Sequence, residues 1–148
     1  MAKALIGAGC FWGIEEYFRK LKGVKKTSVG YSGGKLANPT YKDVCKGNTE
    51  HAEVVLIEYN ELQLSYSELL DHFWRCHDPT QINRQGLDIG TQYRSVIFYY
   101  SDQQKEIAEN SKKEFQKNTS KPVVTNIEKA YEFFLAEDYH QQYIQKKI

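Results

Sequence analysis

An apolar run that passes directly into a helical pattern is the feature that most constrains the fold of this chain. Residues 4–8 are continuously apolar or small, which is typical of a buried strand. The helical pattern that follows consists of Ile14, Tyr17, Phe18 and Leu21. These positions have the i, i+3, i+4, i+7 spacing of an amphipathic helix. We therefore predict a buried strand that turns, at residues 9–13, into a helix packed on the same core.

Three more strand patterns and a second helix continue from this junction. The strands are predicted at residues 27–31, 51–59 and 94–100. The helix starts with a capping box at Ser65 and Glu68, and Pro79 ends it by removing a backbone donor. Its apolar stripe is Tyr66, Leu69, Leu70, Phe73 and Trp74. The resulting order, β-α-β-β-α-β, is that of ferredoxin-like folds, so we predict an α+β, two-layer sandwich.

The last third of the chain is predicted to wrap around this core. It contains a third helix capped at Ser101, short strands at residues 123–125 and 131–134, and a closing helix from Asp138 to about Lys146. We find no repeat or linker, and 148 residues are enough to bury a normal core without disulfides or metal. A single domain, residues 1–148, is therefore expected.

Two unusually long loops lie at residues 33–51 and 77–91. Loops of this length in compact domains are usually functional or disordered. In the ferredoxin-like topology both loops and the end of the first strand can meet at one edge of the sheet. This edge is the expected place for a site.

Composition excludes several classes of function. A net charge of +1 argues against nucleic-acid and membrane-surface binding. Three widely spaced cysteines do not make a disulfide framework, and neither a Cys-x-x-Cys nor a His-x-x-x-His spacing occurs, so no metal site is predicted. The first residues are too short an apolar stretch for a signal peptide or membrane span. We expect a reducing, cytoplasmic setting.

Cys10 is the candidate nucleophile because it lies at the strand-to-helix junction. The unpaired N–H groups of the helix start stabilise a thiolate there, so we predict a thiol pKa below about 8.5. The alternative is a small buried cysteine in the core. Two flanking glycines let a ligand approach the backbone, and the aromatic pair Phe11 and Trp12 needs something to pack on it.

Glu53 is the candidate acid because it interrupts an apolar face. Residues 55, 57 and 59 alternate on the same side of its strand, so its carboxyl faces apolar neighbours. Burial there raises a carboxyl pKa, and the group then holds a proton near neutral pH. The alternative is an exposed strand end where Glu53 pairs with a lysine.

The remaining polar candidates are weaker individually. Tyr41 lies in the first loop, and Asp88 and Tyr93 lie in or beside the second, where ordinary rim residues are common. His51, His77 and His140 are interpreted as local hydrogen-bonding residues. Cys76 falls at a helix end and is interpreted as structural, and Cys45 is a loop thiol without an assigned role.

Gly-Cys-Phe-Trp-Gly at residues 9–13 resembles the active-site signature of the peptide methionine sulfoxide reductase A family. Further segments resemble that family in the same order at residues 38–41, 51–55, 73–74, 77–81, 90–95 and 136–143. They cover nearly the whole chain, which is therefore identified as a member of the family.

The resemblance implies roles for these residues. Cys10 would attack the sulfoxide sulfur and be left as a sulfenic acid, and Phe11 and Trp12 would hold the S-methyl group. Protonated Glu53 would hydrogen-bond the sulfoxide oxygen and give it a proton. Tyr41 and Tyr93 would assist through their hydroxyls, and Asp88 would help to hold substrate through water. The implied activity is reduction of the S epimer of methionine sulfoxide, free or in proteins, and hence repair of oxidised proteins.

Departures from the family pattern bear on how the oxidised Cys10 is reduced again. Many relatives carry resolving cysteines in a C-terminal tail, which this sequence lacks. We therefore expect an external thiol to reduce the oxidised Cys10: glutathione with glutaredoxin, or thioredoxin. No bound cofactor is expected. Attack by Cys45 or Cys76 stays open. Glu50 and Leu87 replace a glycine and an asparagine common in relatives. Some relatives use selenocysteine as the nucleophile. A monomer is expected.

Two rival functions are weighed against this one. The first is a peroxide-reducing or thiol-transfer enzyme that uses Cys10, which gives no reason for the aromatic pair beside it. The second is a ferredoxin-like binding module with Phe11 and Trp12 as a protein contact and Cys10 titrating near about 8.5. Neither accounts for the out-of-pattern Glu53 together with two long loops.

Overall fold

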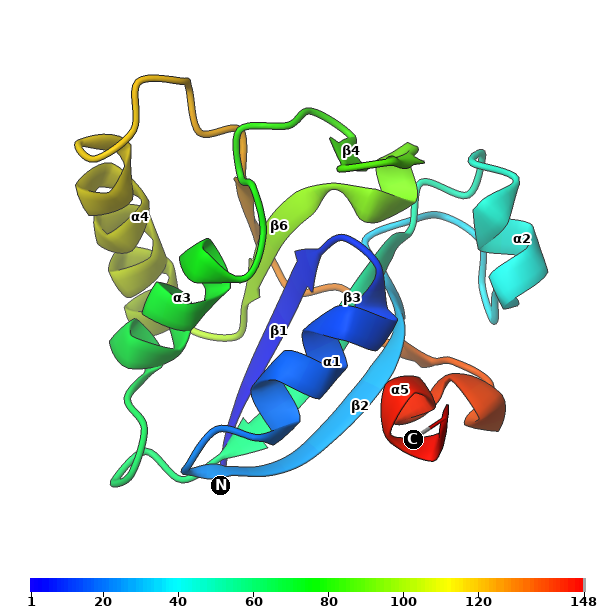
Figure 1. Cartoon of the computed structure of the whole chain (residues 1–148), viewed down its shortest axis with the longest axis horizontal. Helices are drawn as coiled ribbons and strands as arrows, with labels where there is room; N and C mark the ends of the chain where they lie inside the picture. The colour runs from blue at the N-terminus through cyan, green and yellow to red at the C-terminus, as the bar shows by residue number, and fades with distance from the viewer. Residues whose placement is uncertain (148) are drawn as a thin grey trace.

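The computed structural model describes residues 1–147 and has one six-stranded sheet at its centre (Figure 1). The strands are β1 Ala2–Ala8, β2 Val24–Ser32, β3 Ala52–Tyr59, β6 Ser95–Tyr99, β7 Asn126–Lys129 and β8 Phe134–Leu135. The sheet order is β7-β6-β1-β3-β2-β8, and its four central strands are antiparallel throughout. The central order is the one expected for a ferredoxin-like core, and the predicted α+β sandwich is confirmed.

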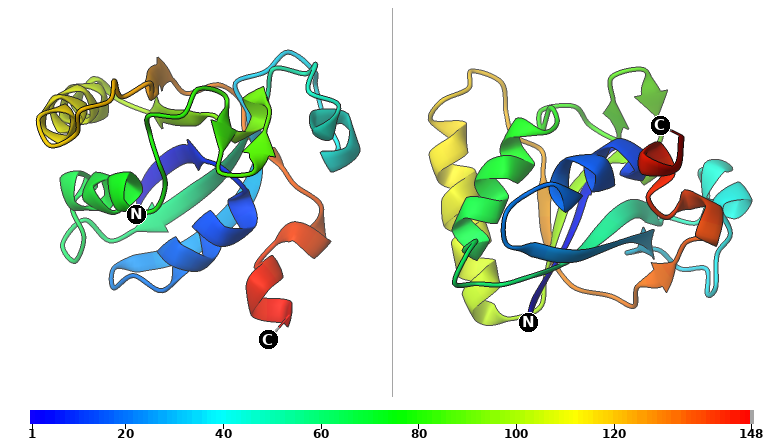
Figure 2. Two further views of the ribbon diagram at one scale, coloured as in Figure 1. Left: turned by 45° about the horizontal axis from the view of Figure 1, so that its top comes forward. Right: turned by 60° about the horizontal axis from the view of Figure 1, so that its bottom comes forward.

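Two helices cover one face of this sheet. The helices of the chain are α1 Phe11–Arg19, α2 Tyr41–Cys45, α3 Tyr66–Arg75, α4 Asp102–Gln116 and α5 Tyr143–Lys147. Figures 1 and 2 show α1 and α3 side by side on the same face. Phe18 of α1 and Phe73 of α3 are fully buried in one cluster with the sheet. The predicted capping box at Ser65 and Glu68 is confirmed, as is the buried stripe of α3.

The last third of the chain wraps around both edges of the sheet, as expected. β7 pairs in parallel with β6 at one edge, and β8 pairs antiparallel with β2 at the other. Between them, Ala130 and Phe133 pack against a smaller cluster on the second face of the sheet. That cluster consists of Leu5, Ala52, Val54, Val96 and Phe98.

The two short strands of this region are displaced from their predicted places. The structure has no strand at residues 123–125, because the N–H of Val123 donates to Gln116 Oε1 at 2.7 Å and that of Val124 to the Pro79 carbonyl at 2.9 Å. These acceptors occupy the backbone N–H groups that strand pairing would use, so the strand β7 begins only at Asn126. The strand predicted at residues 131–134 is likewise reduced to β8.

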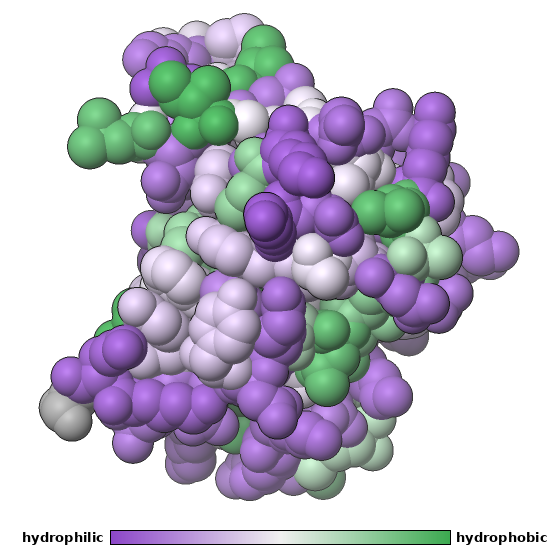
Figure 3. Space-filling view, turned by 90° about the vertical axis from the view of Figure 1, so that its right-hand side faces the viewer, coloured by the Kyte–Doolittle hydropathy of each residue, from purple (hydrophilic) through white to green (hydrophobic). Residues whose placement is uncertain are grey.

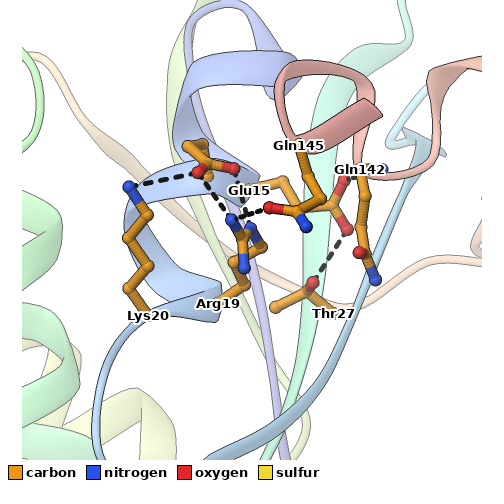
Figure 4. Close-up of polar contacts among 7 residues, drawn as sticks. Glu15, Arg19, Lys20, Thr27, Gln142 and Gln145 are labelled. Carbon is orange, nitrogen blue, oxygen red and sulfur yellow. Dashed lines mark hydrogen bonds and ion pairs between the residues drawn. The ribbon is translucent and has the colours of Figure 1, made fainter. Parts of the chain in front are cut away.

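The closing helix is also interrupted. A 3₁₀ turn at Asp138–His140 precedes α5, and Gln142 between them has a φ of 50°. Figure 4 shows the cause: the Gln142 N–H donates to the buried carboxylate of Glu15 at 2.6 Å, and Thr27 donates to the same group at 2.8 Å. A contact to α1 therefore overrides helix continuity and fixes the C-terminal segment against the core.

Both long loops contain ordered structure. The first includes α2, and the second includes a hairpin of β4 Arg84–Gln85 and β5 Asp88–Ile89, followed by a 3₁₀ turn at Thr91–Tyr93. Figures 1 and 2 show α2 and the hairpin near the end of β1, so the predicted meeting of the loops at one edge is found. Within residues 1–147, no helix combines the length and the apolar character that crossing a membrane requires.

Glu50 has a φ of 64°. A side chain in this left-handed region costs roughly 1–2 kcal/mol. Its ion pair with Lys35, at 3.2 Å, lies in solvent and contributes little. We expect Glu50→Gly to raise the free energy of unfolding by about 1 kcal/mol, which corresponds to roughly 2–4 °C in Tm.

Thermal and urea unfolding would measure this change. Lys35→Ala is the matched control, since it removes the same ion pair without touching the backbone of Glu50. Its Tm should stay within about 1 °C of the parent. A loss of stability in Glu50→Gly would contradict the argument from backbone conformation.

Candidate active site

Cys10 is the N-cap residue of α1, at the junction with β1. Its backbone carbonyl accepts from the Ile14 N–H, but its side chain makes no capping bond, so the sulfur is not used by the fold. Gly9 before it has a φ of 105°, and a Cβ there would lie 2.9 Å from Gln85 of the hairpin. Glycine therefore lets the second loop pack directly against the residue before Cys10.

The pKa of the Cys10 thiol is raised to about 11, which contradicts the predicted lowering. Burial is the largest cause, and the negative charges of Glu53 and Asp88 add to it. The N–H groups of Trp12 and Gly13 at the helix start do lower the pKa, as expected, but they are outweighed. At neutral pH the side chain of Cys10 is therefore a thiol.

Glu53 lies on β3 with only 1 % of its surface exposed. Its Oε1 accepts the N–H of Phe11, the residue after Cys10, at 3.1 Å. Its Oε2 is buried and has no hydrogen-bond partner among the described residues. The predicted rise in pKa is confirmed: burial raises it to about 8, with Asp88 contributing in the same direction and the Phe11 N–H opposing. The alternative of an exposed carboxyl paired with a lysine is wrong.

The aromatic pair beside Cys10 packs against other aromatic rings. Phe11 is buried, with its ring centroid 5.7 Å from that of Tyr31 and 6.3 Å from that of Tyr41. Trp12 donates its Nε1–H to Nδ1 of His140 at 2.8 Å and stacks on Tyr143 at 4.0 Å. Together these rings make an apolar wall next to Cys10.

Glu137 is a residue of this site to which the sequence analysis gave no role. Its Oε1 accepts from the Tyr31 hydroxyl and its Oε2 from the Tyr41 N–H, both at 3.0 Å. It thus joins β2, α2 and the C-terminal segment around the Phe11 ring. No periodicity marks such a residue, because its partners are about 100 positions away in sequence.

The second loop brings Asp88 and Tyr93 to the same place. Asp88 is exposed on β5, and its charge raises the pKa of both Cys10 and Glu53. Tyr93 is half-buried, and burial together with the charge of Glu53 raises its pKa to about 12. Burial likewise raises the pKa of Tyr41. The five other predicted site residues therefore lie around the pair formed by Cys10 and Glu53.

The other thiols and imidazoles have structural surroundings. Cys76 donates to the Phe73 carbonyl at 3.2 Å, and burial raises its pKa to about 12. His77 Nδ1 lies 2.7 Å from the same carbonyl, so that nitrogen carries a proton and is no base for Cys76. Cys45 is exposed, and all three cysteines are free. Within residues 1–147, no three His, Cys, Asp or Glu side chains gather as metal ligands would.

Comparison with known proteins agrees with this geometry. A family model described as "Peptide methionine sulfoxide reductase" matches residues 2–148. The chain belongs to the peptide methionine sulfoxide reductase family. The enzyme of this name from Methanosarcina mazei is 56 % identical over 149 residues, which are 99 % of this chain and 71 % of that one. The chain is therefore an oxidoreductase that reduces methionine sulfoxide and so serves in protein repair.

Solved structures of methionine sulfoxide reductases have the same fold. Reduced Mxr1 from Saccharomyces cerevisiae superposes with a TM-score of 0.94 at 38 % identity, over 98 % of this chain and 84 % of that one. The same yeast protein in complex with Trx2 has a TM-score of 0.69 at 27 % identity, over 96 % and 84 % of the two chains. Membership in this reductase family rules out a non-catalytic binding module and disfavours the peroxide-reducing or thiol-transfer alternative.

Proposed function

We propose that Cys10 is the nucleophile and Glu53 the proton donor in reduction of the S epimer of methionine sulfoxide by this single-domain reductase, residues 1–148. The observation that carries this assignment is the unpartnered, buried Oε2 of Glu53, on a carboxyl whose other oxygen is bonded to the residue after Cys10. A protonated carboxyl at this place needs an acceptor. A sulfoxide oxygen is a strong acceptor of the right size.

The reaction balances with these two groups. The Cys10 thiolate attacks the sulfoxide sulfur and forms an S–S bond, while the sulfoxide oxygen takes the proton of Glu53. The resulting hydroxyl then passes to the Cys10 sulfur, the S–O and S–S bonds to the substrate sulfur break, and methionine leaves. The oxygen ends on the Cys10 sulfur as a sulfenic acid, so that sulfur is oxidised and the substrate sulfur reduced. Glu53 becomes a carboxylate, which restores one negative charge to the pair.

The proton of Cys10 must leave before the attack. At neutral pH both groups of the resting pair are protonated, because their pKa values are about 11 and about 8. The reactive form is the thiolate beside the neutral Glu53 acid. Keeping Glu53 neutral removes the charge that otherwise raises the thiol pKa.

The surrounding residues hold the substrate in this scheme. Phe11 and Trp12 form the apolar contact for the S-methyl group. The hydroxyls of Tyr41 and Tyr93 assist at the sulfoxide oxygen, and Asp88 holds substrate from the hairpin. A wall of this shape on one side of Cys10 favours one epimer.

An external thiol then reduces the Cys10 sulfenic acid. Support for thioredoxin in this role comes from the complex of the related yeast protein with Trx2. Glutathione with glutaredoxin is a second candidate, since it offers the same thiol chemistry. The monomeric state and cytoplasmic setting stay predictions from the sequence.

Thiol counting after one turnover tests the scheme. Without added reductant, one turnover on S-methionine sulfoxide should leave two of three thiols free, with Cys10 trapped as a sulfenic acid and detected by mass spectrometry. Loss of two thiols, with Cys10 joined to Cys45 or Cys76, would contradict the external thiol. Full retention of thiols without methionine formation would contradict the proposed roles.

A further inference from the structure

We propose that an aromatic cavity next to Trp12 binds an aromatic side chain of the oxidised polypeptide, at the position adjacent to its methionine sulfoxide. This inference rests on the proposed function, because it assumes that the sulfoxide lies between Cys10 and Glu53. It adds a second subsite, and with it a preference among peptide substrates.

The cavity has a volume of about 570 Å³ and lies against the C-terminal segment. Its lining residues are Trp12, Tyr41, Tyr139, His140, Tyr143, Lys146 and Lys147. Figure 3 shows the side of the molecule that carries α2 and α5, where weakly polar, pale residues lie together above a strongly hydrophilic lower edge. Four of the lining residues offer aromatic rings, which favours a ligand with an aromatic ring of its own.

His140 holds the orientation of Trp12 at this cavity. Its Nδ1 accepts from Trp12, and an indole N–H can only donate, so Nδ1 carries no proton. Burial lowers the pKa of His140 and keeps the ring neutral. The proton is therefore on Nε2, which is buried and has no partner among residues 1–147, although His140 itself is 0 % exposed. That nitrogen is closed off from the cavity, so the part of His140 in this site is to hold the Trp12 ring through the Nδ1 bond.

Charge at the mouth of the cavity selects against cations. Aromatic boxes also bind cations, but here Lys147 already lies over the Tyr143 ring, 5.1 Å from its centroid. Lys146 donates to the Asp138 carbonyl at 2.9 Å on the same rim. Two positive charges repel a cationic side chain, so the matching ligand is an uncharged aromatic residue.

The cavity and the proposed methyl pocket share two walls. Trp12 and Tyr41 line the cavity. The Tyr41 ring also packs on Phe11, and the Trp12 ring packs on Tyr41, beside Cys10. Successive residues of a peptide are about 3.8 Å apart, and the two sites share these two side chains as walls. A residue adjacent to the methionine sulfoxide is therefore close enough to enter the cavity.

Peptide kinetics test this inference. The substrates are acetylated, amidated peptides with S-methionine sulfoxide between two glycines, or with one glycine replaced by phenylalanine or lysine on either side. We expect kcat/KM for the better phenylalanine peptide to exceed that of the glycine peptide at least tenfold, and the lysine peptides to show no gain. Equal values for phenylalanine and glycine would overturn the inference.

Two tyrosine variants assign the preference to the cavity. Tyr139 lines it and is 57 % exposed, whereas Tyr131 is 55 % exposed and packs on Phe98 away from it. Tyr139→Ala should reduce the phenylalanine-to-glycine ratio to below threefold, and Tyr131→Ala should leave the ratio unchanged. A ratio that persists in Tyr139→Ala would place aromatic recognition elsewhere and overturn the subsite.

The two proposals fail in different ways. If the glycine peptide is not reduced at all, the proposed function fails. If it is reduced, but without any effect of phenylalanine, only the subsite fails, as it would if residues of this chain or a second copy filled the cavity.

Discussion

Replacement of Cys10 by serine is expected to abolish methionine sulfoxide reduction, with a loss of at least about 10⁴-fold in single-turnover rate. The reason is redox chemistry, since sulfur takes up the oxygen as a sulfenic acid and a serine hydroxyl cannot be oxidised in the same way. The fold should survive, because the Cys10 side chain makes no capping bond. Rapid-quench measurement of methionine formation, with circular dichroism as a check on folding, would test this.

Cys45→Ser is the matched control for the nucleophile. Cys45 is an exposed free thiol on α2, close to the site in sequence but not bonded to Glu53. In the proposed scheme its loss leaves the single-turnover rate unchanged. Residual activity in Cys10→Ser, together with inactivation in Cys45→Ser, would contradict the proposal and make Cys45 the nucleophile.

Replacement of Glu53 by glutamine is expected to slow the reductase step at least tenfold, and on the order of 10²-fold. The amide keeps the size of the carboxyl and can still donate a hydrogen bond, but it has no proton to transfer to the leaving oxygen. Stopped-flow measurement of the reductase step separates this effect from regeneration by the external thiol. Glu58→Gln, on the same strand but half-buried at its far end, should leave the rate unchanged.

The pH dependence of kcat/KM reports the titratable groups of the free enzyme. We expect it to follow the titration of Cys10 and Glu53. The reactive form of the pair has lost the proton of Cys10 and kept the proton of Glu53. We therefore expect kcat/KM to rise with pH until about 8, the pKa at which the pair loses its first proton. Between about 8 and about 11 the pair holds one proton and the rate is flat; above about 11 it has none and the rate falls.

Glu53→Gln should remove the break near pH 8, because only the Cys10 thiol then titrates. The lower rate of this variant should instead follow thiolate formation to higher pH. An unchanged profile would assign the break to another group, and an unchanged rate would remove Glu53 from the role of proton donor.

Short-range patterns predicted the core of this protein well. The capping box at Ser65 and the stripe of α3 depend on residues three or four positions apart, so the sequence displays them directly. Glu53 was visible for a similar reason, since alternation on one strand is local. The order of these elements then left the ferredoxin-like sandwich as the expected arrangement.

Long-range polar contacts decided the parts that were predicted wrongly. The strand at residues 123–125 is absent because Val123 and Val124 donate to Gln116 and Pro79. The closing helix is broken because Glu15, near the other end of the chain, accepts from Gln142. Each contact satisfies a buried or partly buried backbone group, and its partner cannot be read from neighbouring residues.

The sequence by itself determined the secondary structure of the core, the burial of Glu53 and the family. Only the tertiary structure decided the protonation of the pair and the support around it. Cys10 stands at a helix start, but burial and two nearby carboxyls, from β3 and the hairpin, outweigh the N–H groups there. A pKa depends on the charges and the solvent within a few ångströms, and folding alone brings those groups together.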